Sequence, residues 1–434
     1  MASNGWKTIR LGDVCLKIGS GATPRGGSEA YLEHGPFTLI RSQNVYNDGF
    51  HRDGLAFIDG RQAAELSNVE VKKDDVLLNI TGDSVARCCQ VETLILPARV
   101  SQHVTIVRPD PEKLNPRFLR YFLVSPKTQV RLLSWAGSGG TRKALTKGMI
   151  ESFEVLAPED LDEQRAIAHI LGTLDDKIEL NRRMNETLEA IARAIFKSWF
   201  ADFDPVRAKA EGRDPGLPKH IADLFPDSFE DSELGEIPKG WRINTVGEEF
   251  NLTMGQSPPG ETYNEIGEGI PFFQGRADFG FRYPKHRVFC TAPTRFADRG
   301  DTLVSVRAPV GDINMALERC SVGRGVAAIR HKSGSRSYTY YAMRSLVDVF
   351  GDFEAEGTVF GCINKDDFHR IKFIAAPQQL VWDFEKAAFP IDETIENHFM
   401  QCRTLAALRD ALLPMLISGE IRVKDAERFL VNTL

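Results

Sequence analysis

The feature that most constrains this 434-residue chain is an internal duplication, in which residues 1–200 and residues 239–420 follow the same plan. Each copy opens with Gly-Trp and has a further glycine six residues after the tryptophan, in the segments Gly5–Gly12 and Gly240–Gly247. Each copy then passes through strand-like segments and closes with a long amphipathic helix. A chain built in this way can present two similar surfaces related by a pseudo-two-fold axis. Palindromic or bipartite duplex DNA is a target that such a pair of surfaces fits.

Length and composition place the chain among globular proteins with two or three separate cores. The sequence holds no transmembrane run and no cleavable signal, so we expect a soluble, cytoplasmic protein without a membrane partner. Its seven cysteines are odd in number and include the adjacent pair Cys88-Cys89, which argues against a disulfide framework. The nine histidines are scattered, and we predict no metal site.

The net charge of −6 is distributed unevenly along the chain. Residues 1–157 carry a net charge of +4, and residues 239–377 carry +2. The segments 158–200 and 378–434 carry −3 each, and residues 201–238 carry −6. Contacts with nucleic-acid phosphates would therefore be confined to the two basic segments, although net charges this small lie within ordinary variation.

Short apolar runs bounded by Gly, Asn and Asp predict strands in both copies. The clearest runs and helices are Phe37–Ile40, Val76–Ile80, Val104–Val107 and a helix at Pro116–Leu123 in the first copy, and Asp301–Val306 and a helix around 338–349 in the second. The predicted fold class is α+β with a pseudo-two-fold internal repeat. Two α/β domains, residues 1–157 and 239–377, alternate with two long helices that pair as an antiparallel coiled coil.

Each copy ends in a helical segment, 158–200 or 378–434, whose apolar stripe steps by three and four residues. The first helix should begin at Pro158, and Pro390 and Pro414 should interrupt or kink the second. Ile191 and Leu408 keep the two stripes apolar near their middle. The predicted seam residues are Leu174, Ile178, Asn181, Asn185, Leu188, Ile195 and Trp199 in the first helix, and Ile391, Ile395, His398, Leu405, Leu412 and Leu416 in the second. The polar members of this seam could fix its register.

The stretch 201–238 is rich in proline and acidic residues, and we predict that it is a solvated linker. The alternative is a segment that masks or mimics DNA, or that contacts a partner.

The sequence lacks the common signatures of catalysis. Gly19-Ser20-Gly21 lacks the third glycine and the helix start of a dinucleotide-binding loop, and no G-x-x-x-x-G-K-[ST] loop is present.

Two further stretches resemble catalytic motifs only superficially. Ser257–Gly260 has Ser and Gly at the defining positions of the Asn/Asp-Pro-Pro-aromatic motif of amino-methyltransferases. Pro109–Lys113 holds the residue types of a nuclease carboxylate cluster, but its prolines deny it the two-strand geometry that holds a metal. We therefore expect no catalytic residue in this chain.

Polar loops follow the predicted strands at matching places in the two copies. Gln and Asn can pair bidentately with adenine, and Arg with guanine. Any one such loop is more simply a solvated turn or a local cap, but their recurrence favours contact with DNA. The candidate contacts are Arg41, Gln43, Asn44, Thr81, Arg87, Gln102, His103, Arg142, Lys143 and Lys147 in the first copy, and Gln274, Arg276, Arg307, Arg324, Asn364 and Lys365 in the second.

The order of these features resembles the specificity subunits of type I restriction–modification systems, the HsdS family. The motifs that carry the resemblance are the openings Gly5-Trp6 and Gly240-Trp241, the loops Gly140-Thr141 and Gly357-Thr358, the runs Glu163–Ile167 and Leu174–Ile178, and Ser198–Arg207, which leads from the first helix into the linker. The resemblance covers essentially the whole chain. The second copy departs from the pattern at Gln378-Gln379, where the family has a Glu-Gln pair.

The resemblance implies two target recognition domains, each of which reads one half of a split site in double-stranded DNA. It implies that the paired helices space the two half-sites and dock two methyltransferase subunits, with restriction subunits joining the full complex. S-adenosylmethionine would bind to the methyltransferase subunits, so we expect no cofactor in this chain. Two other functions remain open: a coiled-coil adaptor without a DNA role, and a DNA methyltransferase or nuclease that acts alone.

Overall fold

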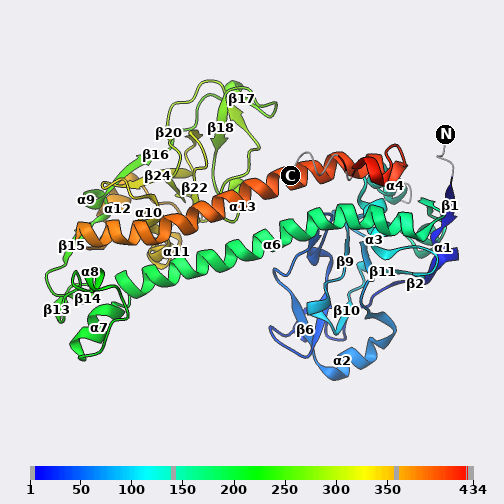
Figure 1. The fold of residues 1–434 in the computed structure, drawn as a ribbon, viewed down its shortest axis with the longest axis horizontal. Coiled ribbons are helices and arrows are strands. Elements are labelled where there is room, and N and C mark those ends of the chain that lie inside the picture. Colours follow the sequence, from blue (N-terminus) through cyan, green and yellow to red (C-terminus); the bar gives the residue numbers. More distant parts are fainter. Residues whose placement is uncertain (1–4, 138–142, 356–360, 427, 429–434) are drawn as a thin grey trace. The chain divides into compact units, whose positions relative to one another are not determined.

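The computed structural model describes residues 5–137, 143–355, 361–426 and 428 (Figure 1). The chain forms two compact units. The first consists of residues 1–181 and 400–434, and the second of residues 182–399. Each unit therefore contains one mixed domain and part of each long helix. Among the described residues, no helix has the length and apolar character needed to cross a membrane.

The mixed domain of the first unit is built from two four-stranded sheets and two strand pairs. One sheet is antiparallel, in the order β2 (Cys15–Ser20), β11 (Val104–Pro109), β8 (Val76–Asn79) and β9 (Cys88–Gln90). The other has the order β6 (Ala56–Ile58), β3 (Phe37–Ile40), β10 (Ala98–Val100) and β7 (Glu70–Val71), with β3 and β10 parallel. β1 (Trp6–Arg10) pairs antiparallel with β12 (Glu154–Pro158), and β4 (Val45–Tyr46) with β5 (Gly49–Phe50).

Short helices complete this domain: α1 (Leu11–Val14), α2 (Gly60–Glu65), α3 (Pro116–Val124), α4 (Pro126–Gly137) and α5 (Lys147–Glu151). α3 begins where the sequence predicts a helix, because the Asn115 side chain accepts a hydrogen bond from Phe118 N and Pro116 needs no backbone partner at this position. Its Phe118, Leu119 and Leu123 are buried in the core shared with β8, β11 and the long helices.

The second unit repeats this plan. Its antiparallel sheet has the order β16 (Phe250–Met254), β24 (Val326–His331), β21 (Thr302–Ser305) and β22 (Ile313–Met315). A five-stranded sheet has the order β17 (Tyr263–Asn264), β19 (Phe289–Cys290), β18 (Ile270–Phe273), β23 (Cys320–Val322) and β20 (Phe296–Ala297). β15 (Arg242–Thr245) pairs with β25 (Lys372–Ala375). The helices are α9 (Val246–Glu249), α10 (Arg336–Ser345), α11 (Val347–Ala355) and α12 (Lys365–Arg370).

Backbone hydrogen bonds confirm that the two domains are copies of one fold. β3 and β10 of the first domain are parallel, and so are β18 and β23 of the second. Ser101 N donates to Ile40 O over 2.9 Å, and Gly323 N donates to Phe273 O over 2.8 Å. Thr81 bridges Ala144, and Arg307 bridges Cys362. The internal repeat is thus present in the pairing of individual residues.

The two long helices are α6 (Leu161–Phe200) and α13 (Gln378–Ser418). They run antiparallel in each unit. In the first unit Asn181 Nδ2 donates to Gln401 Oε1 over 2.6 Å, and Asp175, nearer the start of α6, pairs with Arg409. In the second, Asn185 Oδ1 lies 2.9 Å from His398 Nδ1. The predicted seam positions are buried or half-buried, which confirms the antiparallel helix pair within each unit.

Three expectations about the helices are corrected. α6 begins at Leu161, because Pro158 is the last residue of β12 and pairs with Trp6. α13 is continuous through both Pro390 and Pro414, so burial of the residues around each proline outweighs the lost backbone hydrogen bond. Ile191 is exposed, and Ala192 is the buried residue of the stripe at this point.

Residues 201–238 are packed structure, which corrects the prediction of a solvated linker. They form α7 (Asp204–Ala210), α8 (Lys219–Ala222) and a hairpin of β13 (Phe229–Ser232) and β14 (Gly235–Pro238). Phe203, Val206 and Phe225 are buried in the core of the second unit. The Phe203 ring lies 5.6 Å from that of Trp241, in an edge-to-face contact. Apolar side chains without any regular spacing thus anchor this segment.

Candidate nucleic-acid interface

The polar loops of the first domain meet at the ends of neighbouring strands. Asn79, the last residue of β8, donates from Nδ2 to the carbonyl oxygen of Ser42, which follows β3, over 2.8 Å. The Thr81 hydroxyl lies 2.6 Å from Nδ1 of His103, in the turn between β10 and β11. The backbone of Thr81 also bridges Ala144, just before α5. Four segments that are distant in the sequence therefore meet at this place, where the side chains of Asn79, Thr81 and His103 make polar contacts.

His103 links Thr81 to Gln102. Gln102 Nε2 lies 3.2 Å from His103 Nε2. An amide nitrogen can only donate, so in this orientation of the amide the ring Nε2 accepts; in the corresponding tautomer Nδ1 carries the hydrogen and donates to Thr81 Oγ1. This arrangement leaves the amide oxygen and one amide hydrogen of Gln102 available on an exposed side chain. An amide edge of this kind can pair with the edge of a base.

The loop after β3 is closed by its own side chains. Gln43 Nε2 donates to the carbonyl oxygen of Gly54 over 3.2 Å, and Arg41 donates to the same oxygen. Asn44 Oδ1 accepts from Arg41 N over 3.0 Å, and its Nδ2 donates to His51 O over 3.0 Å. Asn44 is fully buried, which corrects the expectation that it contacts a base. Its amide satisfies the backbone of its own loop instead.

The other candidates of the first domain lie around this cluster. The Arg87 guanidinium is 4.5 Å from the centre of the Tyr46 ring, a cation–π contact that holds the side chain in place. Lys143 is exposed, and its carbonyl oxygen accepts from Gly82 N over 3.3 Å. Lys147 begins α5 and pairs with Glu151 over 3.5 Å. Arg142 lies outside the described residues, as do the loops Gly140-Thr141 and Gly357-Thr358.

In the second domain, the corresponding strand ends carry arginines. Arg307 lies two residues beyond β21, and Arg324 lies in the turn between β23 and β24. Both side chains are exposed, and neither forms an ion pair with a described residue. Arg324 N and Nε lie 3.3 Å and 3.4 Å from Ser257 Oγ, so this hydroxyl tethers the start and the head of the side chain.

The loop after β18 is organised around Asp278, as the loop after β3 is organised around Asn44. Asp278 Oδ2 accepts from Gln274 N over 2.8 Å, and Asp278 is buried. Gln274 and Arg276 are exposed, and Arg276 Nε lies 2.9 Å from Asp312 Oδ2. Asp278 could not be predicted as part of this loop from the sequence, because an acidic side chain has no complementarity to DNA phosphates.

The last two candidates lie at the start of α12. Asn364 caps this helix, since its Oδ1 accepts from Asp367 N over 2.9 Å. Thr146 caps α5 in the same way in the first domain. Asn364 therefore has a structural role whether or not it touches DNA. Lys365 follows it as an exposed first helical residue.

Charged residues that fix each domain on the long helices were also missed. In the first unit, Asp175 of α6 accepts hydrogen bonds from Arg120 over 2.6 Å, Tyr121 over 2.7 Å and Arg409 over 2.6 Å. In the second unit, Asp392 of α13 pairs with Arg282 and accepts from Tyr341 over 3.1 Å. A shift of 217 residues aligns Leu174 with Ile391 in the two helical stripes and also aligns Asp175 with Asp392, so it could have revealed both aspartates.

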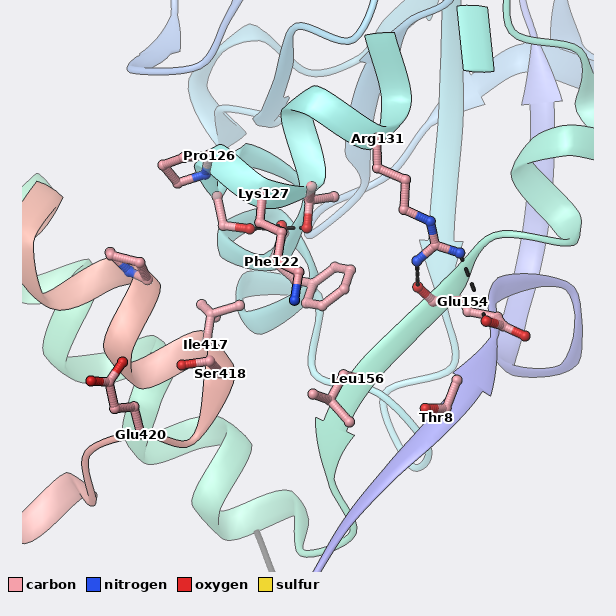
Figure 2. Close-up of a pocket in the computed structure, with 13 residues that line it drawn as sticks. Thr8, Phe122, Pro126, Lys127, Arg131, Glu154, Leu156, Ile417, Ser418 and Glu420 are labelled. Carbon is pink, nitrogen blue, oxygen red and sulfur yellow. Dashed lines mark hydrogen bonds and ion pairs between the residues drawn. The ribbon is translucent and has the colours of Figure 1, made fainter. Parts of the chain in front are cut away.

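A cavity of about 390 Å³ in the first unit lies between α4, β12 and the end of α13 (Figure 2). Arg131 donates to the carbonyl oxygen of Glu154 over 3.2 Å and lies 3.7 Å from its carboxylate, while Ile417 and Leu156 supply apolar walls. None of the candidate DNA contacts lines this cavity.

Comparison with known proteins agrees with this organisation. Residues 3–190 match the type I restriction modification DNA specificity domain. The chain is 30% identical to the MjaX specificity subunit of Methanocaldococcus jannaschii, over 96% of this chain and 94% of that protein. It is 26% identical to the HindI specificity subunit of Haemophilus influenzae, over 96% and 99% of the two chains.

The crystal structure of a type I restriction–modification S subunit from M. genitalium has the same fold, with a TM-score of 0.60 at 16% identity. The match covers 96% of this chain and 97% of that one. The match to the MjaX subunit extends over both mixed domains and both long helices. The chain therefore belongs to the family of type I restriction enzyme specificity subunits.

Proposed function

We propose that this chain is the DNA-reading subunit of a type I restriction–modification complex, and that each mixed domain reads one half of a split site in double-stranded DNA. The observation that carries the proposal is the recurrence of exposed polar side chains at equivalent strand ends. Gln102 in the first domain and Arg307 and Arg324 in the second are exposed at these ends, and Thr81, at the place equivalent to Arg307, is half-buried. Base-edge readout needs amide, hydroxyl and guanidinium groups of this kind.

The remaining part of the proposal concerns partners. Two methyltransferase subunits would dock on the long helices and bind S-adenosylmethionine, and restriction subunits would join them. The helices of the second unit present large apolar side chains to solvent, including Ile191 of α6 and Trp382 of α13. Exposed apolar side chains on helices whose outer faces are otherwise polar suit a protein partner. In this arrangement the present chain contributes sequence recognition and no catalytic group.

The first experiment is single-molecule sequencing of adenine methylation across the genome of the host, with and without this gene. Loss of one split motif with a fixed unspecified gap is the expected result, and it would reveal both half-sites together. Persistence of every methylated motif would contradict the proposal and favour an adaptor role without DNA reading.

A second experiment tests one domain at a time in the complex with its methyltransferase partners. Replacing Arg307 by Ala should weaken binding to one half-site by about 1–3 kcal/mol and leave recognition of the other half-site intact. Arg370→Ala, at an exposed position of the same domain, is the control and should change nothing. An equal loss on every DNA sequence would assign Arg307 to a phosphate.

A further inference from the structure

The backbone hydrogen bonds allow the two domains to be compared residue by residue at their reading loops. Ile80 N donates to His103 O over 3.0 Å, and Val306 N donates to Gly325 O over 2.9 Å. The position before each acceptor is Gln102 in the first domain and Arg324 in the second. These two side chains therefore stand at the same place in the fold.

A second pair of equivalent positions follows from the short bridges beyond the central strands. Thr81 bridges Ala144, and Arg307 bridges Cys362. The neighbouring backbone hydrogen bonds give the same alignment. Leu145 N donates to Ile80 O over 2.8 Å in the first domain, and Ile363 N donates to Val306 O over 3.1 Å in the second. Thr81 and Arg307 are thus equivalent, one beside Gln102 and the other beside Arg324.

The chemistry at these positions differs between the domains. In the first domain, His103 connects the Thr81 hydroxyl and the Gln102 amide, two side chains that carry no charge. The unpaired amide edge of Gln102 offers one donor and one acceptor side by side. This pattern complements the N6 amino group and N7 of adenine in the major groove.

In the second domain, both positions hold guanidinium groups, and His103 is replaced by Gly325. Other arginines near these loops are engaged with carboxylates: Arg276 lies 2.9 Å from Asp312, and Arg287 lies 2.9 Å from Asp278. Neither Arg307 nor Arg324 forms an ion pair with a carboxylate of a described residue. A guanidinium that is free on its outer edge pairs bidentately with O6 and N7 of guanine.

We propose that Arg307 and Arg324 read guanines in the half-site of the second domain, whereas Gln102 reads an adenine at the equivalent place in the half-site of the first. The two halves of the DNA site then differ in a defined way, with guanine in one half where the other has adenine. This inference rests on the proposed function and specifies the bases that the same loops recognise.

The test is selection of bound duplexes from a library with randomised bases, using the chain assembled with its methyltransferase partners. The proteins are the wild type, Arg324→Gln and the reciprocal Gln102→Arg, with Arg370→Gln as the surface control. We expect Arg324→Gln to lower the preference for one guanine by about tenfold to a hundredfold in one half-site only. Gln102→Arg should lower the preference for an adenine in the other half-site by a similar factor.

The outcomes separate this inference from the function on which it rests. Failure of the wild-type complex to select any sequence would contradict the proposed function itself. Selection of a split site in which Arg324→Gln weakens all sequences equally would make Arg324 a phosphate contact and overturn the inference alone. A lost preference for a base other than guanine, or a change in the wrong half-site, would overturn it as well.

Discussion

Asp75 and Arg108 form a doubly hydrogen-bonded ion pair at the start of β8, with Arg108 Nε 2.6 Å from Asp75 Oδ1 and Nη2 2.7 Å from Oδ2. The same relationship recurs in the second domain, where Asp301 precedes β21 and pairs with Arg330 of β24. In each domain the pair joins the central strand to its neighbour at the end opposite the polar loop. The ion pair therefore helps to hold together the sheet from which the polar loops extend.

Replacing Asp75 by Ala should therefore destabilise the first unit without a direct effect on DNA contacts. Asp75 is fully buried, and its loss would leave Arg108 without a carboxylate, so we expect a cost of about 3 kcal/mol. Hydrogen exchange of β8 and β11 measures the effect within this unit. Asp83→Ala, in the exposed loop beyond β8, is the control. A loss no larger than the control's would show that the pair contributes little.

Asp175 gives the first unit a dependence on pH. Burial acts to raise the pKa of this carboxyl, but the charge of Arg120 and hydrogen bonds from Tyr121 and Arg409 lower it overall. A carboxyl whose pKa is lowered on folding stabilises the protein above its unfolded pKa, near 3.8, and loses that contribution as the pH falls through the folded value.

The expected result is a difference in unfolding free energy between the wild type and Asp175→Asn that is constant above about pH 5 and shrinks below pH 4. This difference is measured at each pH by denaturation that is monitored through hydrogen exchange of the α3 amides. Asp176→Asn is a matched control, because Asp176 is exposed on the same helix. A difference that stays constant down to pH 3 would mean that Asp175 titrates alike in both states.

The pair Asn181 and Gln401 should limit the stability of the helix seam. Asn181 is fully buried and donates to Gln401, but its Oδ1 has no hydrogen-bond partner among the described residues. Replacing both residues by Leu should raise the stability of the first unit by about 1–2 kcal/mol, because it removes a buried unsatisfied oxygen. Thermal unfolding measures the gain. Asn181→Leu alone should keep most of this gain, because Gln401 is exposed and water can replace its lost partner.

Gly21 is required by a close approach of two backbone segments. A Cβ at this position would lie 1.8 Å from the carbonyl oxygen of Val100, immediately before the turn that holds Gln102. Gly21→Ala should cost about 1–3 kcal/mol or more and displace this turn. Gly148→Ala is the control, because Gly148 has open space around it and lies in a helix, where Ala is favoured. Equal stability of the two variants would refute the steric argument.

Much of the architecture could be predicted from the sequence, because duplication is visible as a pattern. The stripes of α6 and α13, 217 residues apart, correctly indicated the antiparallel pair within each unit, and polar loops were expected where β8 and β21 end. The segment 201–238 was wrongly predicted, since Phe203, Val206 and Phe225 have no periodic spacing that would indicate burial. Asn44 shows a second limit: an amide that caps its own loop has the same chemistry as one that reads a base.

Substitution of the buried Arg282 should destabilise the second unit more than the loss of any other single charge there. Its guanidinium pairs with Asp392, lies 3.3 Å from Glu189, and stacks 3.6 Å from the centre of the Tyr340 ring. In Arg282→Met, Glu189 would keep Arg344 at 3.4 Å, whereas Asp392 would keep, among the described side chains, only the Tyr341 hydroxyl. The uncompensated carboxylate should cost about 3–5 kcal/mol.

Hydrogen exchange of α10 and of the adjoining turn of α13 measures this loss within the unit. Adding Asp392→Asn to Arg282→Met should restore part of the stability, because it removes the charge that lost its partner. Arg319→Met is the matched control: Arg319 is exposed, its ion pair with Asp298 spans 3.7 Å, and its loss should cost less than about 1 kcal/mol. If the Arg282 and Arg319 variants are equally stable, Arg282 does not hold the second domain on its helices.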